Sequence, residues 1–168
     1  MVSKIDNKFQ IQLKYDPEFE KLIADGKMPD GRIKIRVNDE YLIGGEDHYV
    51  ESIMTGLTLV DLLKAAENTL AGFSGDVELL DSGTYLVIEP HEEGMVTLTK
   101  CFSPTAVEDQ SERHFDPFVV TKDDVISEII RITEEWRDDA LDVNPDIETV
   151  EWFERLQQSI SDVKLEYQ

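Results

Sequence analysis

The spacing of apolar residues changes along this chain, and that change restricts the fold more than any other feature of the sequence. Segments 9–15 (FQIQLKY) and 32–37 (RIKIRV) carry an apolar residue at every second position, which is the pattern of a half-buried β-strand. Segments 58–72 (TLVDLLKAAENTLAG) and 121–143 space their apolar residues three and four positions apart, as an amphipathic helix does. We therefore expect both strands and helices, each with one buried side.

Polar residues and glycine mark the expected helix ends. Thr58 and Thr121 each precede an aspartate by three positions, as in a capping box, and are predicted N-caps. Gly72 is predicted to end the first helix in a left-handed conformation, and Pro145 closes the second. A last helix over about 147–166 has an apolar stripe that is expected to pack antiparallel on the helix before it.

Further strands are predicted between these helices. The segment "HEEG" (91–94) has the composition of a hairpin turn, and residues 103–114 are polar and expected to form a loop. Pro117 restricts the segment around it to an edge strand or to the approach to the next helix. A weaker strand pair is predicted on either side of Gly44-Gly45. The other predicted strands are 76–80, 84–90 and 95–102.

The order strands, helix, strands and two helices indicates an α+β fold. We expect a mostly antiparallel sheet with one central helix and a C-terminal antiparallel helix pair packed on one face. A length of 168 residues suits a single domain, residues 1–168, with its own core. Its parts are N-terminal strands with a short helix (1–56), a helix plus β-hairpin (57–120) and the helical pair (121–168).

Charge is the main chemical feature of the chain. The 37 acidic and 16 basic residues give a formal net charge of −21, and residues 1–37 contain 8 of the basic ones. Such a surface repels nucleic acids and anionic lipids, so we expect neither as a partner. It suits a basic protein partner, mimicry of nucleic acid charge, or a high-salt cytoplasm. The last alternative is a halophile's housekeeping or accessory domain, whose acidity is salt adaptation.

The composition also predicts a cytoplasmic protein. Cys101 is the only cysteine, so no internal disulfide forms, and no Cys/His spacing matches a structural zinc module. The N-terminal residues contain no apolar stretch of signal-peptide length, and no apolar run is long enough to cross a bilayer.

The three histidines are the candidates for a metal site. His48, His91 and His114 could form a catalytic zinc set if the fold brought them together. Each lies in a polar, turn-like stretch, and Met95 stands where a second histidine of an H-E-x-x-H motif would follow His91. Exposed loop histidines are the preferred interpretation, and a metal-dependent hydrolase is the minor alternative.

No other catalytic constellation is present in the sequence. It contains no G-x-S-x-G elbow, no Walker loop and no G-x-G-x-x-G segment. Its paired carboxylates are adjacent residues that share one environment, whereas acid–base catalysis needs two different environments. Cys101 lies in an apolar strand, which favours a buried structural thiol. We therefore predict a protein without enzymatic activity or cofactor.

Trp152 is the candidate anchor for a protein partner. It lies one step off the apolar stripe of the last helix, whereas Trp136 lies on its stripe and is a predicted core residue. A tryptophan exposed within an acidic surface is a plausible binding hot spot, and packing between helices is the alternative. The other predicted partner-binding residues are the exposed acids Glu134, Glu135, Asp138 and Asp139, with Glu92 and Glu93 at the hairpin tip.

Three consecutive segments resemble a known family. The helix "LTLVDLLKAAENTL", the hairpin "YLVIEPHEEGMVTLTKCF" and the segment "PFVVTKDDVISEIIRITEEWRDDA" are similar in layout to small immunity proteins of bacterial polymorphic or wall-associated toxin systems. The resemblance covers about residues 57–140. It implies a protein without catalytic residues that binds one partner and blocks it. Toxin nucleases are usually basic, and an acidic partner is steered to them rapidly.

Overall fold

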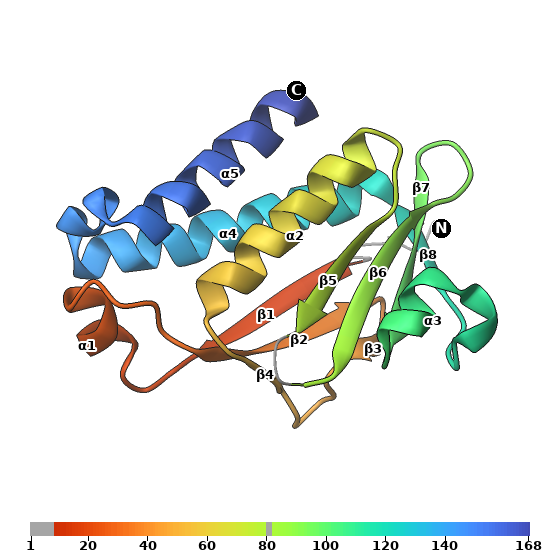
Figure 1. Ribbon diagram of the computed structural model, residues 1–168, viewed down its shortest axis with the longest axis horizontal. Helices are drawn as coiled ribbons and strands as arrows, with labels where there is room; N and C mark the ends of the chain where they lie inside the picture. Colours follow the sequence, from red (N-terminus) through yellow and green to blue (C-terminus); the bar gives the residue numbers. More distant parts are fainter. Residues whose placement is uncertain (1–8, 80–81) are drawn as a thin grey trace, which may run out of the picture.

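The computed structural model describes residues 9–79 and 82–168, and it has an α+β fold with antiparallel sheets, as predicted. Helices α2, α4 and α5 run side by side across one side of the molecule, and the strands lie on the other (Figure 1). The strands form two four-stranded sheets, where the sequence had suggested one. One apolar core connects both sheets with the helices.

The first sheet comprises β1 (Phe9–Tyr15), β2 (Gly31–Val37), β3 (Glu40–Ile43) and β4 (Val50–Ser52). Strand β2 is central, because β1 pairs with one of its edges while β3 and β4 share the other. The outer edge of β1 faces α4 (Lys122–Val143). There the Ile11 N–H donates to Glu128 over 2.8 Å, and the Ile11 carbonyl accepts from Arg131 over 3.2 Å. Side chains of α4 thus form hydrogen bonds with the Ile11 N–H and carbonyl groups at the outer edge of β1.

The second sheet has the order β5 (Gly75–Leu79), β6 (Thr84–Pro90), β7 (Met95–Cys101) and β8 (Phe118–Thr121). Strands β6 and β7 form the predicted hairpin, and Gly94 in its turn has a φ of 77°. Strand β8 is an edge strand, as the proline before it suggested. Asp81 in the predicted β5–β6 turn and Leu80 at the end of the predicted 76–80 strand lie outside the described residues.

Helices α2 (Thr55–Leu70), α4 and α5 (Glu151–Tyr167) cover the core. Helix α5 runs antiparallel to α4, and Lys164 near its end donates to Glu134 over 2.8 Å. It also packs along α2, which lies close on β5. A Cβ atom at Gly75 would lie 2.8 Å from the Ala65 Cα, so the small residue permits this close approach.

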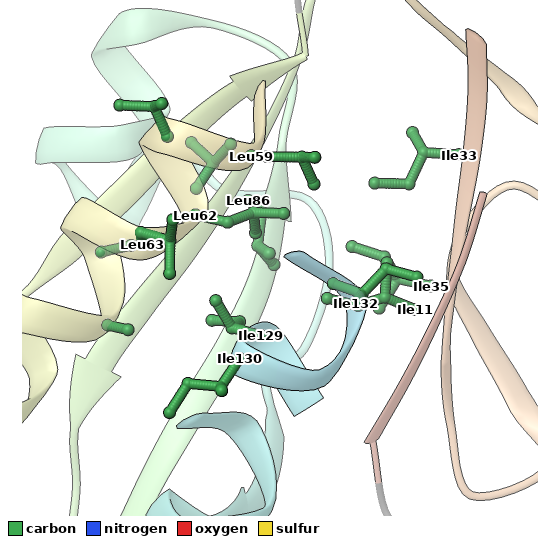
Figure 2. Close-up of a cluster of buried hydrophobic side chains, with 14 of the residues drawn as sticks. Ile11, Ile33, Ile35, Leu59, Leu62, Leu63, Leu86, Ile129, Ile130 and Ile132 are labelled. Carbon is green, nitrogen blue, oxygen red and sulfur yellow. The ribbon is translucent and has the colours of Figure 1, made fainter. Parts of the chain in front are cut away.

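The core lies where the first sheet, α2, α4 and β6 meet. Figure 2 shows Ile11 and Ile35 of the first sheet close to Ile132 of α4, and Ile33 across from Leu59 of α2. Leu86 of β6 lies next to the leucines of α2. Burying each such side chain contributes about 1.5–3 kcal/mol. The chain therefore forms its core from segments at both ends of the described sequence.

Several boundaries differ from the prediction. Helix α2 begins at Thr55, so Thr58 is a buried residue inside the helix and not its N-cap. Residues 103–114 are not a simple loop, since they contain α3 (Pro104–Glu108) and the 3₁₀-helix η1 (Gln110–Glu112). The predicted last helix is divided into the 3₁₀-helix η2 (Pro145–Thr149) and α5. No described helix has both the length and the apolar composition that a bilayer crossing requires.

The start of α2 is determined by a distant loop. The Met54 N–H donates to the Asp30 carboxylate over 2.7 Å, and the Thr55 N–H donates to the Pro29 carbonyl over 3.1 Å. These acceptors satisfy N–H groups at the helix start that a capping side chain would otherwise bind. By contrast, Thr121 is the N-cap of α4 as predicted, because its hydroxyl accepts from the Asp124 N–H.

Candidate functional site

Trp152 lies in the first turn of α5, where η2 turns the chain after α4. Its indole Nε1–H donates to the Gly26 carbonyl over 3.1 Å, which ties α5 to the loop after α1 (Phe19–Ala24). The ring packs edge-on against Trp136, with 6.0 Å between the ring centroids, and against Phe153 at 5.7 Å. Trp136 is buried in the core as predicted, so Trp152 rests on a rigid aromatic support.

One side of Trp152 forms the wall of a partly open cleft of about 270 Å³, here named the Trp152 cleft. The loop before β2 and the first turns of α2 and α5 form its other walls. Its lining residues are Met28, Gly56, Leu57, Val60, Glu151, Trp152 and Arg155. The interior is mainly apolar, with Glu151 and Arg155 as the charged lining residues.

The Trp152 cleft has the composition of a protein-binding hot spot. Tryptophan, methionine and arginine are enriched at protein interfaces, and hot spots gather where an apolar group fills a pocket. Because its indole is already held by Gly26 and Trp136, Trp152 loses little conformational entropy when a partner binds. Trp152 is half-buried, so it combines the two alternatives: its ring packs on Trp136 and Phe153, and part of it stays exposed. A role in binding stays a prediction.

The four predicted acids of α4 are not the free acidic surface that the sequence suggested. Glu134 accepts from Lys164 of α5 over 2.8 Å and lies 3.7 Å from Arg137, which also contacts Asp138 over 3.0 Å. Glu134 is only half exposed, and Asp138 remains exposed. Neighbouring cations therefore neutralise much of this predicted patch.

The other two acids face β1. Glu135 pairs with Arg131 over 2.6 Å, and Asp139 accepts from the Tyr15 hydroxyl. Burial, and then the hydrogen bond to Asp139, raises the pKa of Tyr15 far above its usual value, so the phenol remains a donor. Asp139 thus helps to attach α4 to β1, whereas Glu135 stays exposed and pairs within its own helix. The expectation of four exposed acids is therefore wrong for Glu134 and Asp139, which are only half exposed.

The hairpin tip is more accessible. Glu92 and Glu93 are exposed in the turn between β6 and β7, next to the exposed His91. The turn is closed by the His91 N–H, which donates to the Met95 carbonyl over 3.2 Å. The predicted position of these two acids is thus confirmed, while their role in binding is untested.

The histidines are not brought together. His48 lies in the turn between β3 and β4, His91 at the β6–β7 turn and His114 after η1, and all three are exposed. Within residues 9–79 and 82–168, no group of three or more His, Cys, Asp or Glu side chains could hold a metal ion. The geometry therefore does not assemble the three-histidine zinc set considered from the sequence.

A second recess lies on the outer face of the second sheet, and the sequence did not predict it. Helix α3 and η1 fold back over β6 and β7, where Ala106 packs on Val87 and Cys101. Burial raises the pKa of the Cys101 thiol, which favours its unreactive protonated form. The signal that was available is Ser103-Pro104, because the Ser103 hydroxyl caps α3 by accepting from the Ala106 N–H.

The surroundings of two carboxyl groups on α2 disfavour their charged form. Burial is the main cause that raises the pKa of Asp61 and of Glu67. Like charges add to the effect, with Asp76 of β5 near Asp61 and Glu166 of α5 near Glu67. Part of the chain's acidity therefore opposes folding near neutral pH.

Comparison with known proteins finds no matching family model, no matching curated protein and no matching solved structure.

Proposed function

We propose that this chain is a non-enzymatic, acidic protein-binding module that engages a basic protein. The observation that carries the proposal is the Trp152 cleft, a preorganised apolar recess on a chain with a net charge of −21. An apolar recess supplies contact energy that pure charge attraction lacks, and it gives a partner a defined point of attachment.

The net charge would act before contact is made. A strongly acidic surface raises the rate at which a basic partner arrives, and this steering weakens as salt screens it. The exposed Glu92 and Glu93 at the hairpin tip add to that field. The specific form of the proposal is an immunity protein that occupies and blocks a basic toxin.

The test is capture of a partner from extract of the native host, followed by reconstitution with the purified components. We expect a basic protein that binds at an ionic strength of about 0.05 M and dissociates substantially at about 0.5 M. Leu57→Glu, which introduces charge into the Trp152 cleft, should weaken binding at least about tenfold, a change typical of hot-spot residues.

Leu165→Glu is the matched control, because Leu165 is 71% exposed on the far end of α5 and receives the same change in charge. Circular dichroism of both variants verifies that they are folded. Equal loss of binding in the two variants would show that the Trp152 cleft makes no specific contribution to binding. Failure to find a basic partner, or binding that salt leaves unchanged, would refute the function itself.

Salt adaptation is the second candidate, and the spread of the acids favours it. Exposed acids occur on several distant parts of the fold, including Asp25 after α1, Glu40 of β3, Glu93 of the hairpin and Glu154 of α5, although strands β1 and β2 contain none. A surface adapted to molar salt carries acids over much of its area, whereas a single binding site needs them in one place. The dependence of the melting temperature on KCl, described below, separates the two candidates.

A further inference from the structure

The recess on the outer face of the second sheet is a groove of about 440 Å³, here named the outer groove. Glu89, Thr97 and Thr99 of strands β6 and β7 contribute from the sheet, and the segment 110–117 and the β6–β7 turn contribute the remainder. The full lining is Glu89, Pro90, His91, Thr97, Thr99, Gln110, Arg113, Phe115, Asp116 and Pro117. The volume lies within the range of small-molecule sites, and the lining combines an aromatic ring with several polar groups.

Arg113 is the only lysine or arginine in this lining, and its donors are directed into the protein. Its guanidinium makes two hydrogen bonds to Glu89, at 2.6 and 3.3 Å, and one each to the carbonyls of Ala106 and Val107, both at 2.7 Å. Its side chain is 7% exposed. Arg113 thus fixes the wall of the outer groove but offers little to an anionic ligand.

The remaining polar groups of the outer groove can all accept hydrogen bonds, and one of them, Asp116, is a carboxylate. Asp116 is exposed, and no described lysine or arginine lies within ion-pair distance of it. The Thr97 hydroxyl can accept or donate, whereas Thr99 is only 1% exposed, and Glu92 and Glu93 stand beyond His91 on the adjoining hairpin tip. A ligand with hydrogen-bond donors and positive charge therefore complements this site, whereas an anion would meet repulsion.

Phe115 supplies the apolar wall of the outer groove, and two neighbouring residues hold its ring in place. The Phe115 ring packs edge-on against Phe102, with 5.4 Å between the ring centroids, and the Lys100 ammonium lies 4.5 Å from the Phe115 centroid. Phe115 is nevertheless 43% exposed, so part of the ring remains available to the apolar portion of a ligand.

We propose that the outer groove binds a small group of cationic, donor-rich chemistry, namely a primary amine or guanidinium on a short aliphatic stem. The cation lies against Asp116 and donates toward the Thr97 hydroxyl, while the stem contacts Phe115. Such a group could belong to a free small molecule or to a lysine or arginine side chain. The site is separate from the Trp152 cleft, and the inference does not depend on the proposed protein-binding function.

The test is a titration of the ¹⁵N-labelled protein followed by two-dimensional NMR, with agmatine as the cationic probe. We expect saturable shifts of the amide signals of Thr97, Thr99 and Gln110. The neutral probe 1-pentanol and the anionic probe glutarate should bind much more weakly. Asp116→Asn should weaken agmatine binding about fivefold, the upper end of the effect of one exposed ion pair. Asp142→Asn on α4, a matched loss of one exposed acid, should leave the affinity unchanged.

A second arm uses an acetylated and amidated Gly-Arg-Gly peptide. Tighter binding of agmatine would identify a free amine or guanidine as the ligand, and tighter binding of the peptide would identify a protein side chain. Absence of saturable shifts with both cationic probes, or equal binding of pentanol, would overturn the proposal. An Asp116→Asn variant with wild-type affinity would also overturn it, and the same spectra report whether each variant is folded.

Discussion

Replacing Arg113 by methionine should be among the more damaging single substitutions outside the main core. The arginine connects the α3–η1 segment to β6 through its ion pair with Glu89 and its bonds to two carbonyl groups of α3. The Arg113 side chain is 7% exposed and that of Glu89 is 18% exposed. Methionine retains most of the stem's volume, so the change isolates the loss of the guanidinium.

The size of the destabilisation depends on how far the unpaired Glu89 carboxylate remains buried after the substitution. Removing one partner of a buried ion pair typically costs about 3–5 kcal/mol, because the other charge is left uncompensated. Glu89 is partly accessible, so water relieves some of that penalty, and we expect about 3 kcal/mol. Neutralising Glu89 as well, in Arg113→Met/Glu89→Gln, should recover roughly 1–2 kcal/mol.

Urea denaturation followed by circular dichroism measures the free energy of unfolding of each variant. Hydrogen exchange at Ala106 and Val107 then shows whether the α3–η1 segment opens on its own. Arg137→Met is the control, because the described partners of Arg137 are the half-exposed Glu134 and the exposed Asp138, so this change should cost less than about 1 kcal/mol. The reasoning is refuted if Arg113→Met costs no more than this control.

Three further predictions concern stability. The pKa values of Asp61 and Glu67 are raised in the folded state, so their ionisation opposes folding. Stability should therefore rise as the pH falls from neutral toward their ordinary values of 3.8 and 4.5, and thermal melts should show a shallower rise for Asp61→Asn. If acidity is salt adaptation, molar KCl should raise the melting temperature by about 10 °C, roughly 3 kcal/mol, and a flat response would contradict it. Gly75→Ala should cost about 1–3 kcal/mol in urea denaturation, since its Cβ would lie 2.8 Å from the Ala65 Cα, whereas Gly45→Ala, whose nearest atom is 3.8 Å away, should be nearly neutral.

The sequence predicted the ends of those helices and strands that are set by residues close by in the chain. The Thr121 cap with Asp124 and the hairpin turn at Gly94 both follow from short-range rules, and both are observed. The start of α2 could not be read in the same way, since its acceptor Asp30 lies 24 residues from Met54. A distant carboxylate replaced the local cap that the sequence offered at Thr58.

The candidate sites were predictable to a smaller extent for the same reason. The offset of Trp152 from its apolar stripe was visible in the sequence, but its cleft also needs Met28 and the first turn of α2. The pairing of Glu135 with Arg131 has helical spacing, whereas Asp139 meets Tyr15 across 124 residues. Charge patterns along the chain therefore overstated the acidity that remains free on α4.

The contacts that cover the edge of β1 impose an order on folding during synthesis. Ile11 binds Glu128 across 117 residues and Arg131 across 120, so the ribosome releases β1 long before it produces α4. Until then, the nascent strand presents unpaired groups at Ile11 that can join strands of other chains. A translational pause before α4 should therefore increase misassembly, and chaperone binding should be strongest in that interval.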